Sequence, residues 1–264
     1  MTLSTLLQYE DNWPTELGGV SVQSGTVTLR GHDLLNSLED LSWMGMLMFG
    51  ITGRRFTPSQ LELFTGLWKI SASYPEPRIW NNRVAALGGT CRSTPGLSLG
   101  AALAVTDATI YGQRPMIGAF DFLQRALKSR DEGTPLRDFV VDELKTYRTI
   151  PGFGRPLRSV DERLAPAQRL ARRIGLWGGR HTLLALEIEK ILEKYRQGMN
   201  IAALTAALVA DQGLSVDEYK RGASLTFAAG LILCEFDAAH HPEGSLFPLR
   251  CERIRYQGPP ARTW

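Results

Sequence analysis

Apolar residues recur at helical spacing along most of the chain. Asp40–Gly50 is a nearly continuous apolar segment, which predicts a buried helix that ends at a C-cap glycine, Gly50. Thr57, Pro58 and Gln60 are the residue types of an N-cap, a first turn and a capping box, so a second helix is expected to start there. This pattern is typical of a mostly helical protein.

One segment near the N-terminus has a different pattern. Val27 and Leu29 alternate with polar residues within Ser21–Gly31, which predicts a short strand after a turn. The other segments with helical character lie further along the chain, at Trp80–Ala86, Leu97–Ile110, Phe120–Leu127, Asp161–Ile174, Leu183–Tyr195 and Ala223–Glu235.

A glycine loop interrupts the helical pattern within Tyr147–Arg163. A proline and two glycines there exclude a continuous helix and let the backbone turn and approach a ligand closely. Such a loop, followed by arginines, suits a ligand that carries phosphates or carboxylates. An ordinary surface loop with solvated arginines fits the same residues equally well. The loop consists of Ile150, Pro151, Gly152, Phe153 and Gly154, and the arginines are Arg155, Arg158 and Arg163.

Composition limits the classes of function. The 264 residues carry a net charge of only +3, with no basic run interleaved with aromatic residues, so no nucleic-acid partner is expected. The three cysteines are far apart and form no CxxC motif, so neither disulfides nor a metal site are expected. No basic segment of a signal peptide and no apolar run of about 18 residues is present, which favours a cytoplasmic protein without a membrane span.

Several motifs in the same order resemble those of the citrate synthase superfamily. In that family a Pro-Gly-aromatic-Gly-His loop cradles coenzyme A and precedes an Asp-Pro-Arg. The corresponding residues here are Pro151–Arg155 and Asp161–Arg163. The chain also carries segments similar to the family's Arg-Gly-Tyr-Asp, Pro-Asn-Val-Asp and Arg-Tyr-x-Gly-Pro, at Arg30–Asp33, Gly198–Ala202 and Arg255–Pro259.

The resemblance fails at the residues on which the family's chemistry depends. The family mechanism requires one aspartate and two histidines, which move protons and hydrogen-bond an enolate oxygen. Their positions here hold Ala202, Pro115 and Arg155. Because a missing acid or base alone slows a reaction by about 10²–10⁴-fold, ordinary citrate synthesis is not expected.

The resemblance implies an all-α fold with a large helical domain and a smaller, mobile helical domain. Residues 1–114 and 214–264 would form the large domain, and residues 115–213 the small one. The family also implies a homodimer, built here from the helix at Leu97–Ile110, and coenzyme A or an acyl-CoA as co-substrate without a metal. The short length is closer to citryl-CoA lyase, or to the matching domain of ATP-citrate lyase, than to long citrate synthases.

The candidate site residues follow from the loop and from the matched motifs. The glycine loop from Ile150 to Gly154 would hold coenzyme A. Arg155 and Arg163 would grip an anion; alternatively, Arg155 pairs with a nearby acid such as Asp161 and only closes the loop. The other candidates are Tyr111, Arg114 and Asp121 for acid–base chemistry, and Asn200 and Arg253 for substrate binding, with Arg250 as the alternative to Arg253.

Three interpretations remain open. The chain is an enzyme that acts on an acyl-CoA or a polycarboxylate through a remodelled site, in a lyase, condensation or related step. Alternatively, it is a non-catalytic binding or regulatory protein of the same fold. In the third interpretation it has ordinary citrate synthase or citryl-CoA lyase activity, and the residue matches above are wrong.

Overall fold

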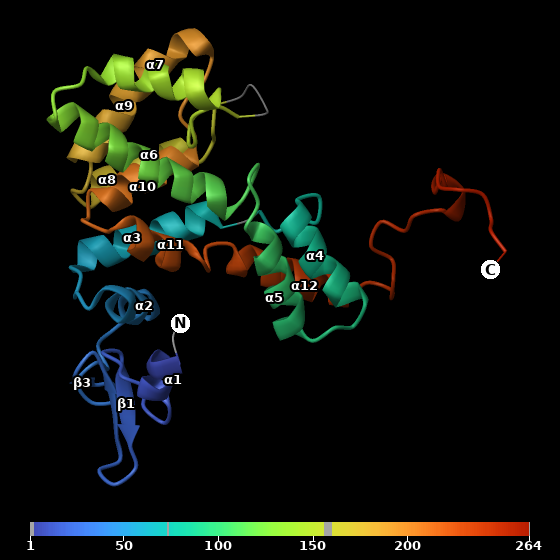
Figure 1. Ribbon diagram of the computed structural model, residues 1–264, viewed down its shortest axis with the longest axis horizontal. Helices are drawn as coiled ribbons and strands as arrows, with labels where there is room; N and C mark the ends of the chain where they lie inside the picture. The colour runs from blue at the N-terminus through green and yellow to red at the C-terminus, as the bar shows by residue number, and fades with distance from the viewer. Residues whose placement is uncertain (1–2, 73, 156–159, 264) are drawn as a thin grey trace. The chain divides into compact units, whose positions relative to one another are not determined.

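The computed structural model describes residues 3–72, 74–155 and 160–263 (Figure 1). The chain is mostly helical, as the sequence predicts. Its helices form two compact units. Unit 1 comprises Met1–Ser71 and Pro115–Ser224, and unit 2 comprises Ala72–Arg114 and Leu225–Trp264. The family's division into a large and a small mobile domain stays a prediction.

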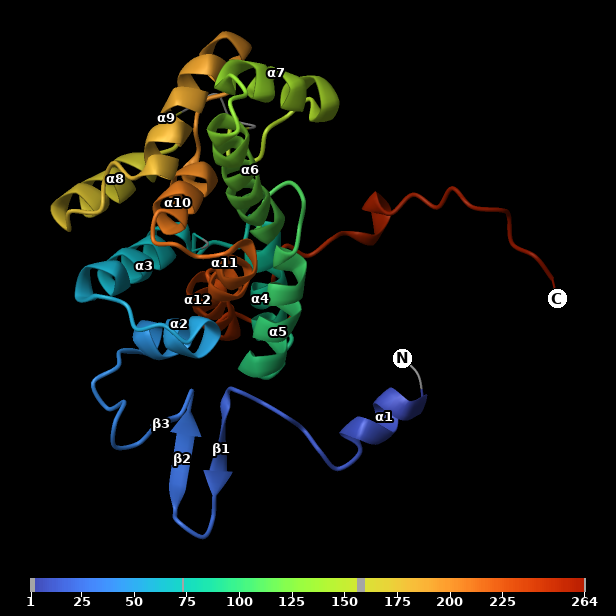
Figure 2. The ribbon, with the colours of Figure 1, turned by 60° about the vertical axis from the view of Figure 1, so that its left-hand side comes forward.

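Unit 1 begins with the short helix α1 (Leu3–Tyr9) and a small antiparallel sheet (Figure 2). The sheet pairs Val20 with Val27 and Leu29 with His32, in the order β1-β2-β3. The strand predicted within Ser21–Gly31 is therefore confirmed as β2. The three strands are β1 (Gly18–Ser21), β2 (Thr26–Leu29) and β3 (His32–Asp33).

The next two helices test the predicted helix ends. Helix α2 (Trp43–Thr52) is the expected buried helix, but it continues past Gly50 and ends at Gly53. Gly53 takes the left-handed conformation with φ 69°, and its N–H donates to the Phe49 carbonyl, so the prediction of Gly50 as the cap is wrong. Both glycines are cap candidates by type, and only the backbone conformation separates them.

Helix α3 (Pro58–Ser71) starts where its capping signal predicts. The N–H of Gln60 donates to Thr57 Oγ1 at 3.3 Å, and the N–H of Thr57 donates to Gln60 Oε1 at 2.9 Å. These reciprocal bonds form the capping box and satisfy two backbone groups at the helix start.

The core of unit 1 surrounds α10 (Ile201–Ala210), which is buried along its whole length. Alanine side chains dominate this helix, so α3, α8 and α9 approach it closely. The surrounding helices are α6 (Gln113–Asp131), α7 (Leu136–Tyr147), α8 (Leu164–Arg173) and α9 (Arg180–Leu192), which is extended by the one-turn η1 (Glu193–Tyr195).

Helix α6 begins earlier than its amphipathic pattern suggests. Gln113, Arg114 and Pro115 form its first turn, ahead of the predicted segment Phe120–Leu127. Proline is tolerated there because the first N–H groups of a helix have no intrahelical partner.

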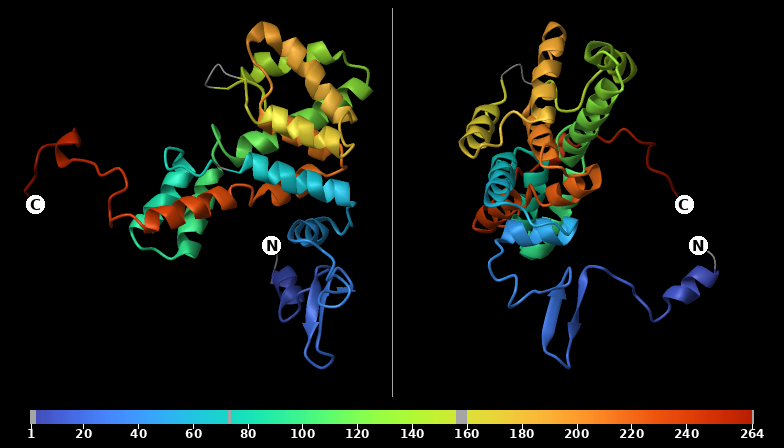
Figure 3. Two further views of the ribbon diagram at one scale, coloured as in Figure 1. Left: turned by 180° about the vertical axis from the view of Figure 1, so that it is seen from behind. Right: turned by 90° about the vertical axis from the view of Figure 1, so that its left-hand side faces the viewer.

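Unit 2 is built on α4 (Trp80–Thr90), α5 (Pro95–Thr106) and α12 (Ala228–Ala239), which lie side by side in Figures 1 and 3. A Cβ atom added at Gly89 would lie 2.3 Å from the Glu235 carbonyl oxygen, so α4 and α12 pack with their backbones close together. Helix α5 ends at Thr106, four residues before the predicted limit. The chain after α12 contains the one-turn η2 (Cys251–Arg253).

One stretch, Val216–Ala239, has the length and apolar composition of a membrane-spanning helix. It comprises α11 (Val216–Ala223) and α12, and 44% of its most apolar window is buried within the protein. Core helices pass the same test, so length and composition are weak evidence for a span.

Candidate functional site

The glycine loop is tied to the segment that leads into α10. Backbone bonds join the Gly154 N–H to the Gly198 carbonyl at 2.6 Å and the Asn200 N–H to the Gly152 carbonyl at 2.9 Å. The N–H of Phe153 donates to the Ile150 carbonyl at 3.1 Å. Two of the loop N–H groups therefore donate within the chain and do not point at an external anion.

Close packing explains why the loop needs glycine at position 152. Gly152 has φ +87°, and an added Cβ would lie 2.7 Å from the Ala203 Cβ and 2.8 Å from the Ala119 Cβ. Both the left-handed backbone and the contact with α6 and α10 exclude a side chain. Pro151 packs against α6 in the same way, with its ring atoms 3.1 Å from the Cβ position of Gly118.

Asn200 links the loop to the start of α10. Its side-chain Oδ1 accepts from the N–H of Ala202 at 2.9 Å, which makes it the N-cap of α10. Its Nδ2 donates to the Gly154 carbonyl at 2.9 Å. These bonds position the loop; a contact of Asn200 with substrate stays a prediction.

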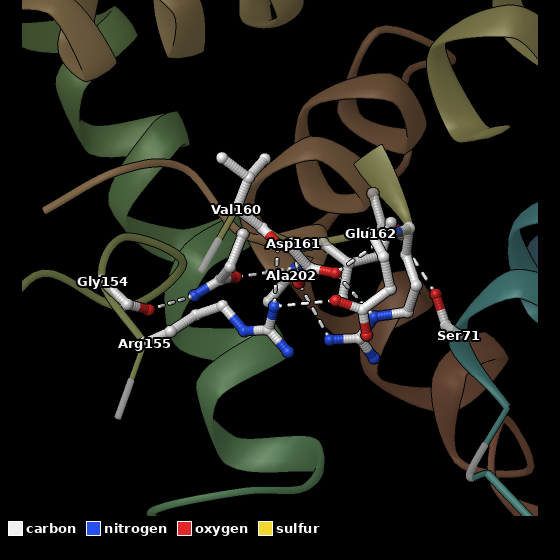
Figure 4. A network of polar contacts seen from close by, with 11 residues as sticks. Ser71, Gly154, Arg155, Val160, Asp161, Glu162 and Ala202 are labelled. Atoms are coloured by element: carbon white, nitrogen blue, oxygen red, sulfur yellow. Dashed lines mark hydrogen bonds and ion pairs between the residues drawn. The ribbon is translucent and has the colours of Figure 1, made fainter. Parts of the chain in front are cut away.

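Asp161 joins the second half of the loop to the same helix (Figure 4). Its carboxylate is buried and accepts from the Arg163 N–H, Nε and Nη2 and from the N–H of Ile201, at 2.9–3.1 Å. Burial alone would raise the pKa of Asp161, but the hydrogen bonds from Arg163 and Ile201 outweigh it and hold the pKa below its usual value. Arg163 thus already holds a carboxylate of the chain, with two parallel bonds.

Arg155 lies at the edge of this network and is partly accessible. Its Nη1 donates to Glu162 Oε2 at 2.9 Å and to the Val160 carbonyl at 3.2 Å. The Arg155 side chain is 20% exposed and that of Glu162 is 58% exposed. Asp161, the acid that the sequence offers as the partner of Arg155, pairs with Arg163 instead. The third arginine of the loop, Arg158, lies outside the described residues.

The remaining candidates do not join this network. Asp121 is on α6, where its carboxylate accepts from Arg125 at 2.9 Å, and Arg125 also pairs with Glu143 on α7. Arg114, the other candidate in α6, pairs with Asp107 at 3.0 Å. Both contacts have the form of ion pairs between parts of the fold, and they do not test the roles proposed for these residues.

Tyr111 and Arg253 belong to unit 2. The Tyr111 ring packs edge-on against Trp80, with ring centroids 5.3 Å apart. Its hydroxyl is buried and has no hydrogen-bond partner within the described part of the chain. Arg253 is an exposed residue of η2. The acid–base role of Tyr111 and the substrate contact of Arg253 stay predictions.

A partly buried carboxylate–imidazole pair lies at the far end of α10. Asp211 Oδ1 is 3.0 Å from His181 Nδ1, and its carboxylate also accepts from the N–H groups of His181 and Thr182 at 2.7 and 3.0 Å. Gly179, the N-cap of α9, leaves the space for this carboxylate, because a Cβ there would lie 2.3 Å from it. Asp211 is therefore the cap of α9. It lies nine residues, or about 13 Å of helix, after Ala202, so it does not take the place of the aspartate that the family has at that position.

No local sequence signal marks Asp211, because it caps a helix about 30 residues earlier in the chain. Sequence reasoning does not single out Glu162 either, although it directly precedes Arg163, a predicted site residue, and pairs with Arg155. Over the ranges 3–72, 74–155 and 160–263, no group of three histidine, cysteine or acidic side chains is placed to hold a metal ion.

Comparison with known proteins identifies the fold. No protein-family model and no curated protein matches the chain. Among solved structures, citryl-CoA lyase from Hydrogenobacter thermophilus is similar over 96% of this chain and 97% of its own, with a TM-score of 0.81 and 18% identity.

Longer enzymes match as well. ATP citrate lyase from Methanothrix soehngenii, in complex with citrate and coenzyme A, matches 98% of this chain but only 44% of its own, with a TM-score of 0.77 and 19% identity. Citrate synthase from Thermoplasma acidophilum, with carboxymethyl coenzyme A and oxaloacetate, matches 98% of this chain and 63% of its own, with a TM-score of 0.61 and 13% identity. The chain therefore has the all-α citrate synthase-like fold, in a short form that corresponds to citryl-CoA lyase over nearly its whole length.

Proposed function

We propose that the chain binds a coenzyme A thioester or a polycarboxylate beside the glycine loop and catalyses a carbon–carbon lyase or condensation step on it. One observation carries the proposal: Arg155, a partly exposed cation, lies at the edge of a loop that is fixed on the start of α10. The fold supports the choice of ligand, because the similar ATP citrate lyase is bound to citrate and coenzyme A.

Arg155 suits the binding and the stabilisation of negative charge. An arginine side chain is a poor general base. It can hold a carboxylate or a phosphate, or stabilise the oxyanion of an enolate, through charge-assisted hydrogen bonds. Only one nitrogen, Nη1, makes the bonds to Glu162 and Val160, so the guanidinium has further N–H groups on its other nitrogens.

Proton transfer in this proposal falls to Tyr111 or Asp121, whereas Arg114, like Arg155, can only stabilise negative charge. The buried Tyr111 hydroxyl has no partner in the described residues and has a proton to donate. Arg114 and Asp121 each form an ion pair with a neighbour, with Asp107 and Arg125 respectively. A role in catalysis would require either residue to exchange that partner for substrate.

The alternative is a protein of the same fold that binds its ligand without turnover. Pro115, Arg155 and Ala202 stand where the family has its acid and base groups, and Asn200 and Arg163 bond to the chain itself. This arrangement maintains the shape of the loop without supplying an evident base. The two functions share the binding step and differ only in chemistry.

Turnover assays distinguish the two. We would follow the 2-oxo acid and acetyl-CoA formed from citryl-CoA, and the acyl-CoA products and free coenzyme A formed from acetyl-CoA plus a panel of 2-oxo acids, for wild type, Arg155→Ala and Arg173→Ala. Arg173 is a matched control, because it pairs with an exposed glutamate, Glu62, in the same unit.

The enzyme proposal predicts turnover of at least one acyl-CoA, lost in Arg155→Ala and retained in Arg173→Ala, but no citrate from acetyl-CoA and oxaloacetate. Binding without any turnover would favour the alternative. Robust synthesis of citrate would contradict both and show that the residue matches are wrong.

A further inference from the structure

Two residues that depart from the family's loop pattern contact each other. Arg155 stands in the place of the family's histidine, and Glu162 in the place of its proline. Arg155 Nη1 lies 2.9 Å from Glu162 Oε2 in the network of Figure 4. The two departures are therefore complementary in charge and joined in space.

The neighbouring acids of this loop have different environments. Asp161 is buried and accepts four hydrogen bonds, including the one that fixes Ile201 at the start of α10. The Glu162 side chain is 58% exposed and reaches back to Arg155 from the solvent side. Asp161 is thus a fixed part of the fold, whereas water or another anion can take the place of Glu162.

The carboxylate of Glu162 has the same chemistry as one acid group of the proposed ligand. A carboxylate seven residues away in the same chain competes at a high effective concentration for Arg155. A ligand that brings a single carboxylate to Arg155 only exchanges one carboxylate for another. A ligand with a phosphate, or with two or more carboxylates, gains further charge-assisted bonds and overcomes the competitor.

We infer that Glu162 is an internal competitor that occupies Arg155 until an anionic ligand displaces it, and so lowers the affinity of every anion that binds there by the same factor. This inference rests on the proposed function, since it requires that Arg155 holds the ligand. Glu162 thereby sets a threshold that only ligands with further charge-assisted bonds, such as polyanions, exceed by a wide margin.

Calorimetric titration of Glu162→Gln with citrate, with coenzyme A and with acetate tests this inference. Glutamine has nearly the same shape but no charge, and an exposed side chain tolerates it. The matched control is Glu62→Gln, which removes the charge from the exposed Arg173–Glu62 pair in the same unit. Circular dichroism at 25 °C establishes that each variant is folded.

We expect Glu162→Gln to bind citrate about 1.5- to 5-fold more tightly than wild type, the range that corresponds to one partly exposed ion pair. Its affinity for acetate, where measurable, should rise by the same factor, and Glu62→Gln should match wild type. Suppose that wild type binds and that Arg155→Ala binds more weakly. Unchanged or weaker binding by Glu162→Gln would then overturn the inference and leave the proposed function standing. Absence of binding to wild type and to Glu162→Gln alike would overturn both.

Discussion

Substituting Asp161 by asparagine tests how the glycine loop is fixed. Oδ1 of Asp161 accepts from the Arg163 N–H and Nε, and Oδ2 accepts from Arg163 Nη2 and the Ile201 N–H. Asparagine replaces one of these oxygens by an NH₂ group, which donates and cannot accept. Whichever way the amide is turned, two of the four bonds are lost and Arg163 loses its counter-charge.

The magnitude follows from the number and the kind of bonds lost. A hydrogen bond to a charged group contributes about 1.5–3 kcal/mol, so two lost bonds cost about 3–6 kcal/mol. The Arg163 side chain is 15% exposed and can turn partly to water, which favours the lower end of that range. We expect Asp161→Asn to lower the free energy of unfolding by about 3 kcal/mol at pH 7.

Guanidinium unfolding followed by tryptophan fluorescence measures this change. Asp40→Asn is the matched control, because Asp40 pairs with Arg55 at 3.4 Å but is 66% exposed, and we expect it to change stability by less than about 0.5 kcal/mol. A loss below about 1 kcal/mol for Asp161→Asn would refute the argument that the buried carboxylate fixes the loop.

The pH dependence gives an independent check on the same carboxylate. Because the folded-state pKa of Asp161 is lowered, its contribution is present above the unfolded pKa of about 3.9 and is lost as the pH falls through the folded pKa. The difference in unfolding free energy between wild type and Asp161→Asn should therefore shrink below about pH 4. A constant difference down to pH 2 would contradict the assignment.

Three further predictions concern the loop, the α9 cap and assembly. Gly152→Ala should lower the free energy of unfolding by about 2–4 kcal/mol, because Gly152 has a positive φ and contacts Ala203 and Ala119. Gly25→Ala, with φ +62° but open space around it, should lower it by about 1–2 kcal/mol in the same guanidinium unfolding assay. Equal losses would count against the packing argument. Asp211→Ala should cost about 2–3 kcal/mol by uncapping α9, and a change under about 0.5 kcal/mol in the same assay would rule that role out. We also propose a homodimer through α5, where Leu97 is 70% exposed, so light scattering should give a dimer for wild type and a monomer for Leu97→Glu; a monomeric wild type at micromolar concentration would contradict this.

Local sequence signals predicted much of the helical framework. The Thr57–Gln60 box, the apolar segment of α2 and the alternating residues of β2 all act within a few positions along the chain. Helix α11 carries the same kind of signal, because Ser215 and Glu218 form a capping box at its start. The choice between Gly50 and Gly53 was wrong because it depends on backbone conformation rather than on residue type.

The contacts that make the site were much less accessible from sequence. Asp161 bonds to Ile201 across 40 residues, and Asp211 caps a helix about 30 residues earlier in the chain. These contacts depend on how helices pack, which no local pattern encodes. The proline and glycines predicted the break in the helical pattern between α7 and α8, but residue type could not tell which arginine would pair with Asp161 and which would stay partly accessible.

The central claim is that Arg155, beside the glycine loop, holds the ligand's negative charge. Calorimetric titration of wild type and Arg155→Ala with coenzyme A and with citrate tests it most directly. We expect wild type to bind at least one of the two and Arg155→Ala to bind it about 10-fold or more weakly, as for the loss of a charge-assisted pair of about 1.5–3 kcal/mol, with Arg173→Ala unchanged. Equal affinity of wild type and Arg155→Ala for every ligand that wild type binds would contradict the account.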